Sequence, residues 1–67
     1  MITVSVNDVP RQVGADGTVA QLLAHMVLPL RGIAVAVNGE VVRRAEWPVR
    51  RLSDGDRVEV LTAAQGG

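Results

Sequence analysis

The sequence predicts an α+β fold in which a mixed sheet of about five short strands packs on one main helix. Apolar and polar residues alternate in residues 1–6 and 57–62, as they do in strands that bury one face. Residues 19–26 instead place apolar side chains at helical spacing. Turn sequences containing Asn, Asp or Gly separate these segments. Because one helix covers only one face of a sheet, we expect the other face to be open to partners.

The first two strands are predicted to form a hairpin. Residues 1–6 alternate apolar and polar side chains, and residues 9–13 return after a tight turn at Asn7-Asp8. Pro10 has no backbone N–H to donate to a neighbouring strand, which indicates the edge or the start of the second strand. We expect the first strand to lie beside the last strand, in parallel.

A helix of about ten residues is predicted after Thr18 from its start and stop signals. Thr18 and Gln21 form the T-x-x-Q pattern of a capping box, in which each side chain accepts from the other residue's backbone N–H. The apolar stripe that follows occupies positions i, i+3, i+4 and i+7, namely Val19, Leu22, Leu23 and Met26. Pro29 is expected to end the helix.

A second hairpin is predicted in the middle of the chain. Residues 33–37 form a continuous apolar run, typical of a central strand, and Asn38-Gly39 is a strong hairpin turn before a return strand over residues 40–43. Residues 44–53 show little periodicity, so we expect a compact loop there. Trp47 and Leu52 are interpreted as its inward anchors, with packing rather than ligand binding as the role of Trp47.

The last strand is predicted over residues 57–62, after a turn at Asp54-Gly55-Asp56. That turn lacks the later ligand positions of a calcium loop. In the strand, one face carries Val58 and Val60, and the other carries Arg57, Glu59 and Leu61. Leu61 is therefore a candidate for an apolar docking patch on the outer face.

The composition restricts the classes of function. The chain has 67 residues with no net charge, seven Arg, no Lys and no Cys. A general nucleic-acid binder would be basic, so we expect no nucleic-acid partner. Neither a signal peptide nor an apolar run long enough to span a membrane is visible, which favours a cytoplasmic protein. We expect a single domain over residues 1–62, a flexible tail over residues 63–67, and a monomer when the protein is free.

The tail is the best candidate for chemistry. It reads Ala63-Ala64-Gln65-Gly66-Gly67. Two glycines without Cβ atoms make a slender end that can enter a narrow channel and place the Gly67 carboxylate in another protein's active site. Elsewhere we find no nucleophile–base pair, phosphate-binding loop or metal-ligand spacing, so we do not expect an enzyme.

Two other features have simpler interpretations. His25 has no second ligand or nucleophile near it in sequence, and we interpret it as a surface or boundary residue. A local basic patch is interpreted as a solvated loop, with docking to an acidic partner or to RNA as the alternatives; it consists of Arg43, Arg44, Arg50 and Arg51.

Two runs stand out at this point. The first is V-N-G-E-V-V-x-R-x-E-W, from Val37 to Trp47, and the second is L-x-D-G-D-x-V-E-V-L-x-A-x-Q-G-G, from Leu52 to Gly67. Both resemble the ThiS sulfur carrier proteins of thiamine biosynthesis. The family usually has a proline where this chain has Arg43, a difference that falls in a loop. The resemblance implies a β-grasp, ubiquitin-like fold, which agrees with the element order above.

The resemblance also implies a function, that of a sulfur carrier on which other enzymes act. A ThiF-like adenylyltransferase would adenylate the Gly67 carboxylate with ATP, and sulfur from a cysteine desulfurase or another donor would replace AMP. Thiazole synthase would consume the thiocarboxylate. The chain itself would hold no cofactor and no metal, since ATP is used by the activating partner. The partner-binding residues would be Gln65, Gly66, Gly67 and Leu61.

Three other functions remain open. The small subunit of molybdopterin synthase shares the fold, the Gly-Gly end and the thiocarboxylate, but it is usually longer and richer in aromatic residues than this chain, which has one. A β-grasp module that binds RNA or protein without terminal chemistry would tolerate a truncated or extended tail. A ubiquitin-like modifier would attach Gly67 to other proteins.

Overall fold

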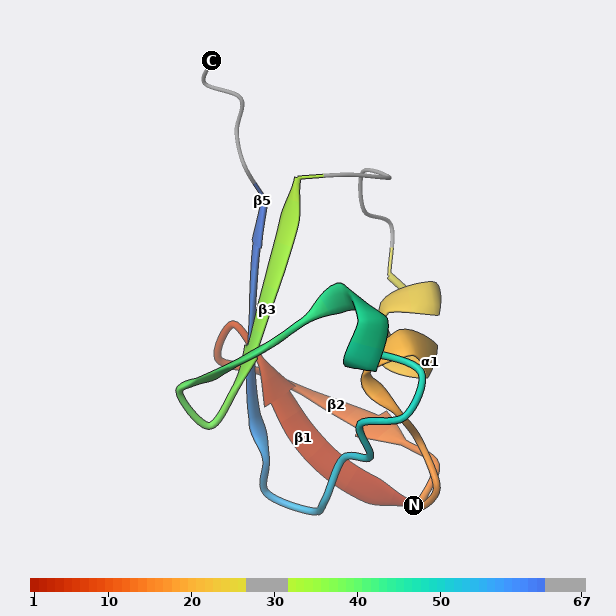
Figure 1. Ribbon diagram of the computed structural model, residues 1–67. Helices are drawn as coiled ribbons and strands as arrows, with labels where there is room; N and C mark the ends of the chain where they lie inside the picture. Colours follow the sequence, from red (N-terminus) through yellow and green to blue (C-terminus); the bar gives the residue numbers. More distant parts are fainter. Residues whose placement is uncertain (27–31, 63–67) are drawn as a thin grey trace.

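The sheet and its helix have the predicted arrangement. The computed structural model describes residues 1–26 and 32–62. Five strands form one mixed sheet in the order β2-β1-β5-β3-β4, and α1 lies against one face of it (Figure 1). The elements are β1 Ile2–Val6, β2 Val9–Val13, α1 Val19–Ala24, β3 Ile33–Val37, β4 Glu40–Val42, the 3-10 helix η1 Arg44–Glu46 and β5 Arg57–Thr62.

The first and last strands are adjacent and parallel, as expected. Ser5 is paired with Arg57 and Val6 with Val58 in the β1–β5 register. On its other side β5 is antiparallel to β3, from Val37 opposite Val58 to Ile33 opposite Thr62. The strand that leads into the tail is therefore the central strand of the sheet. The edge position indicated by Pro10 is also confirmed, because β2 is paired with β1 alone and ends the sheet.

A valine-rich core fills the space between the sheet and α1. Alternation places one face of each strand inward, because successive strand residues project to opposite faces. The buried set contains one aromatic residue, Trp47, and no polar or charged residue among those the structure describes. Its members are Val4, Val6, Val19, Leu22, Val35, Val37, Val42, Trp47, Leu52, Val58 and Val60.

The helix is shorter than the sequence predicts. Its capping box is present, with the Gln21 N–H donating to Thr18 Oγ1 (3.3 Å) and the Thr18 N–H donating to Gln21 Oε1 (3.1 Å). The α-helical residues number six, and the C-cap is His25. The His25 N–H donates to Leu22 O, so the last turn tightens to i→i−3 bonding. The expected end at Pro29 lies outside the described residues.

The segment after β4 is more ordered than the predicted loop. Strand β4 ends at Val42 rather than Arg43, because Arg43 becomes the N-cap of η1. Trp47 and Leu52 are buried, which confirms them as inward anchors. The segment also satisfies two free N–H groups at the start of α1, since Trp47 O accepts from Ala20 N (3.0 Å) and Arg50 O accepts from Val19 N (2.9 Å).

Candidate functional site

Strand β5 carries the chain to the predicted reactive end. The expected site residues Gln65, Gly66 and Gly67 lie outside the described residues, whereas Leu61 and Thr62 are described and exposed. Residues 63–66 separate Thr62 from Gly67 in the sequence. The geometry that bears on the site is therefore that of β5 and of the elements that hold it.

The turn before β5 is fastened by its two carboxylates. Asp54 Oδ1 accepts from the Thr3 N–H (2.8 Å), which ties the turn to β1. Asp56 Oδ2 accepts from the Ser53 N–H (2.8 Å), and Asp56 Oδ1 accepts from Asn38 Nδ2 (3.0 Å) in the β3–β4 hairpin. The left-handed backbone at Gly55 (φ 88°) closes the turn. These contacts confirm Asp54-Gly55-Asp56 as a structural turn that sets where β5 begins.

A small apolar patch lies on the face of the sheet opposite α1, beside the end of β5. Leu61 is opposite Ala34 in the β3–β5 register, and Val41 is opposite Ala36 in the β3–β4 register. Directly opposite residues project to the same face. Leu61 is 67% exposed and Val41 is 74% exposed. We call Ala34, Ala36, Val41 and Leu61 the outer patch, and it agrees with the open face expected from a single helix.

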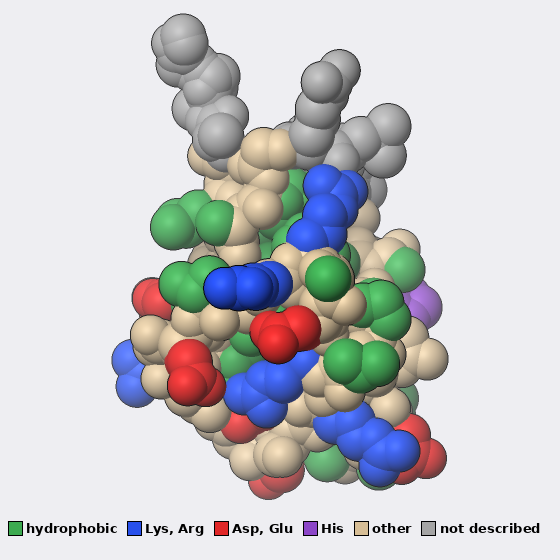
Figure 2. All heavy atoms as spheres, in the orientation of Figure 1, with side chains coloured by type: hydrophobic (Ala, Val, Ile, Leu, Met, Phe, Trp, Pro, Cys, Tyr) green, Lys and Arg blue, Asp and Glu red, His purple; other side chains and the backbone are tan. Residues whose placement is uncertain are grey.

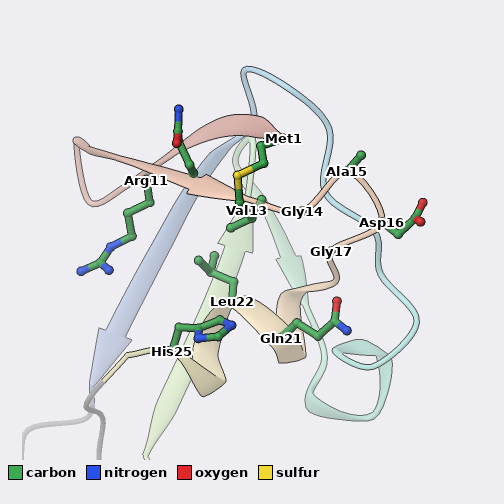
Figure 3. A pocket seen from close by; sticks show the side chains of 11 residues that line it. Met1, Arg11, Val13, Gly14, Ala15, Asp16, Gly17, Gln21, Leu22 and His25 are labelled. Atoms are coloured by element: carbon green, nitrogen blue, oxygen red, sulfur yellow. The ribbon is translucent and has the colours of Figure 1, made fainter.

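A groove lies between β2 and α1 (Figure 3). Val13 and Leu22 give it apolar walls, and Figure 3 shows Arg11 and His25 on one side of it. Asp16 is the carboxylate among its lining residues, and no Ser, Thr, Cys or Lys nucleophile is among them. His25 is exposed, as expected of a surface residue. The groove therefore offers contacts but not the grouping of a nucleophile with a base that catalysis uses.

The face of the molecule that carries η1 bears charges of both signs (Figure 2). On the face that carries η1, arginine side chains are interspersed with carboxylates and apolar side chains (Figure 2). The Arg44 guanidinium carbon lies 5.3 Å from the centroid of the Trp47 ring, within cation–π range. This mixture favours the solvated-loop interpretation over a docking surface for an acidic partner.

Two other classes of site find no support in the described part of the chain. Within residues 1–26 and 32–62, no three His, Cys, Asp or Glu residues come together in a way that would hold a metal ion. Over the same ranges, no helix is long and apolar enough to cross a membrane.

Comparison with known proteins assigns the family. The profile of the ThiS family matches residues 4–67. The sulfur carrier protein ThiS of Thermus thermophilus is 44% identical over 50 residues, which is 75% of this chain and 78% of the relative. The sulfur carrier protein ThiS of Escherichia coli is 33% identical over 61 residues, which is 91% of this chain and 92% of the relative.

A solved structure shares the fold. The crystal structure of the thiamine biosynthesis protein ThiS from Geobacter metallireducens superimposes with a TM-score of 0.83 at 32% sequence identity, and covers 98% of this chain and 100% of its own. The β-grasp fold predicted from the sequence is therefore confirmed. With the family profile spanning nearly the whole chain and both curated relatives above 30% identity, this protein belongs to the ThiS family.

Proposed function

We propose that this protein is a sulfur carrier of thiamine biosynthesis whose sulfur is held at the Gly67 carboxyl carbon. The observation that carries the proposal is the match to the ThiS family up to the last residue, Gly67, together with the curated relatives named as sulfur carriers. The position of β5 supports it, because the central strand of the sheet leads directly into residues 63–67.

The chemistry follows from the poor reactivity of a carboxylate. An oxygen of the Gly67 carboxylate attacks the α-phosphorus of ATP on a ThiF-like adenylyltransferase, and pyrophosphate leaves. A persulfide sulfur from a cysteine desulfurase or another donor then attacks the acyl carbon, and AMP leaves. A thiol cleaves the resulting S–S bond, which leaves the Gly67 thiocarboxylate and a disulfide. The chain has no cysteine, so both the persulfide and the thiol belong to partners.

The next step uses the thiocarboxylate as a nucleophile. Thiazole synthase takes the sulfur from the Gly67 carbon during formation of the thiazole ring: the C–S bond breaks, an oxygen from the ring precursor or from water replaces the sulfur, and the chain returns with a carboxylate. The protein is thus a co-substrate whose own side chains supply no acid, base or nucleophile. The acyl adenylate is sensitive to water, so the activating enzyme must enclose the tail. Gly66 and Gly67 suit this enclosure because they have no side chains to accommodate.

We assign the outer patch to the docking of the activating adenylyltransferase. The patch adjoins the point where the chain leaves the sheet, since Leu61 lies two residues before Ala63. An enzyme seated on the outer patch therefore reaches the tail without crossing the core. The exposed Leu61 and Val41 supply apolar area, and Arg57 and Glu59 lie on the same face of β5 to orient the enzyme.

The molybdopterin synthase small subunit is the second candidate, because it shares the terminal chemistry. The family profile and both curated relatives favour the thiamine pathway instead. Supplying the thiocarboxylate form to thiazole synthase and, in parallel, to a molybdopterin synthase that lacks its own small subunit separates the two, and we expect sulfur consumption with thiazole synthase alone.

Intact-mass measurement tests the carrier chemistry. The protein is incubated with its adenylyltransferase, ATP, a cysteine desulfurase and cysteine. We expect a mass gain that corresponds to exchange of one oxygen for sulfur, located on Gly67 by fragmentation. A chain without Gly67 is the matched variant, because it keeps the folded domain and ends on Gly66. If that variant gains sulfur to the same extent, the assignment to the Gly67 carboxyl is wrong.

A further inference from the structure

The end of β5 extends past the strand that lies parallel to it. The β1–β5 pairing stops with Val6 opposite Val58, whereas β5 continues to Thr62. Strand β3 remains paired with β5 over this stretch, on the opposite edge. The backbone groups of β5 that face the β1 side beyond Val58 therefore need hydrogen-bond partners from outside the ladder.

Asn7 provides these partners for Val60. Its backbone N–H donates to Val58 O (2.9 Å). Its side-chain amide then makes two bonds to the next inward-facing residue: Oδ1 accepts from the Val60 N–H (2.9 Å), and Nδ2 donates to Val60 O (3.0 Å). Both bonds are partly buried and join residues 53 positions apart in the sequence. The amide thus takes the place of one further residue of β1.

The backbone conformation of Asn7 makes this double contact compatible with the hairpin. Asn7 has a φ of 51° in the left-handed region, which asparagine tolerates better than most residues. The main chain can therefore turn toward β2 at Asn7 while the amide stays on β5. Glycine would keep the same backbone conformation but would lose both contacts to Val60.

We propose that Asn7 is a positioning residue for the tail that carries the sulfur. Val60 lies three residues before Ala63 and opposite Val35 in the β3–β5 register, and both its N–H and its C=O are bonded to Asn7. With β3 on one edge and Asn7 on the other, β5 stays extended up to Thr62, the last described residue before the tail. An enzyme seated on the folded domain then meets the start of the tail at a fixed place. A frayed end of β5 would have to be ordered when the enzyme binds, and this ordering cost weakens productive binding.

Asn38 provides a matched control at the other end of the same strand. It also has a left-handed backbone, with a φ of 52°. Its Oδ1 accepts from the Arg57 N–H (2.9 Å) and its Nδ2 donates to Asp56 Oδ1 (3.0 Å). Replacing either asparagine by glycine therefore removes two side-chain hydrogen bonds from β5 or its turn and keeps the positive φ. The two variants differ in whether the lost bonds lie beside the tail.

The experiment compares Asn7→Gly and Asn38→Gly by two measurements. Amide hydrogen exchange of Val60 in the free protein reports the contact itself. ATP–pyrophosphate exchange with the adenylyltransferase reports KM and kcat for the carrier. We expect Asn7→Gly to speed Val60 exchange by about tenfold or more and to raise KM several-fold with little change in kcat. Asn38→Gly is expected to leave Val60 exchange and KM within about twofold of the original protein, because the contacts of the Asn38 side chain are confined to the start of β5.

The outcomes separate this inference from the proposed function on which it rests. An unmodified chain that is never adenylated refutes the proposed function, whatever the exchange of Val60. An unmodified chain that is adenylated, with the same KM in both glycine variants, refutes the positioning role alone. Val60 exchange that is unaffected by Asn7→Gly refutes the contact. Should Asn7→Gly fail to fold, Asn7→Asp replaces it, because it keeps the acceptor and the side-chain size but sets a carboxylate oxygen against Val60 O.

Discussion

Trp47 is expected to contribute more to stability than any other single side chain of this protein. It is the one aromatic residue of the chain, is 9% exposed, and packs in the core with ten aliphatic residues. Its Nε1 donates a buried hydrogen bond of 3.0 Å to Val42 O. Two substitutions separate these contributions: Trp47→Phe keeps an aromatic ring without the donor, and Trp47→Ala removes the ring as well.

The magnitudes follow from burial and from the size of the domain. Removing a buried aromatic side chain costs about 3–5 kcal/mol. Leaving the Val42 carbonyl without its donor costs about 1–3 kcal/mol, which sets the expected loss for Trp47→Phe. At about 0.05–0.15 kcal/mol per residue, 67 residues give a total stability of about 3–10 kcal/mol. Trp47→Ala therefore removes between about a third of the stability and all of it. The loss for Trp47→Phe is smaller.

Urea unfolding followed by far-UV circular dichroism measures both losses. Tryptophan fluorescence is unsuitable, because the chain has no Tyr or Phe and the variants would lose the signal. We expect the midpoint to fall in the order original, Trp47→Phe, Trp47→Ala, with unchanged slope. A loss below about 1 kcal/mol for Trp47→Ala would refute Trp47 as the anchor of the segment between β4 and β5.

Three further predictions concern single elements. Thr18→Ala removes the capping-box acceptor and should lower the free energy of unfolding by about 1 kcal/mol in urea unfolding; no change would mean that the cap is dispensable. Gly55→Ala should lower the free energy of unfolding by about 1–2 kcal/mol, because the φ of Gly55 is 88°. Gly14→Ala should raise it by about 0.4–1 kcal/mol, because a Cβ added at Gly14 would meet no atom within 4 Å. Thermal melts in which Gly55→Ala is stabilised or Gly14→Ala is destabilised would contradict this. Leu61→Asp should leave stability within about 0.5 kcal/mol but raise the Kd of the adenylyltransferase about tenfold by calorimetry; unchanged affinity would remove Leu61 from the docking surface.

The sheet was predictable because its signals are local. Alternation in residues 57–62 separates Val58 and Val60, which are buried, from Leu61, which is exposed. Asn38-Gly39 sets the second hairpin, and a single helix leaves one face of the sheet open. Each of these inferences can be made from a few neighbouring residues or from the number of predicted helices and strands. The pairing of β1 with β5 follows once both strands must bury one face against the same helix.

Two parts of the fold have no such local signal. The segment after β4 is held to α1 by backbone bonds, such as Ala20 N–H to Trp47 O, and backbone bonds place no requirement on side-chain type. The helix was overestimated because apolar spacing continues to Met26 whether the last turn has i→i−4 or i→i−3 bonds. Periodicity alone does not distinguish these two kinds of turn.

The chemistry of the candidate site stays a prediction, whereas part of its support is visible in the structure. The Gly66-Gly67 end and the absence of cysteine are the sequence features that predict the terminal carboxylate as the reactive group. Asn7, in contrast, reads as a turn residue, and its positive φ confirms that role. Its contacts with Val60 depend on a partner 53 residues away, which only the tertiary structure brings close.

Transfer of labelled sulfur tests the central claim most directly. The thiocarboxylate form is prepared with isotopically labelled sulfur on Gly67, separated from all small molecules, and given to thiazole synthase with its other substrates. We predict that the label appears in the thiazole ring and that the chain returns to its original mass. Label that stays on the protein, or a thiazole formed with unlabelled sulfur, would contradict the account.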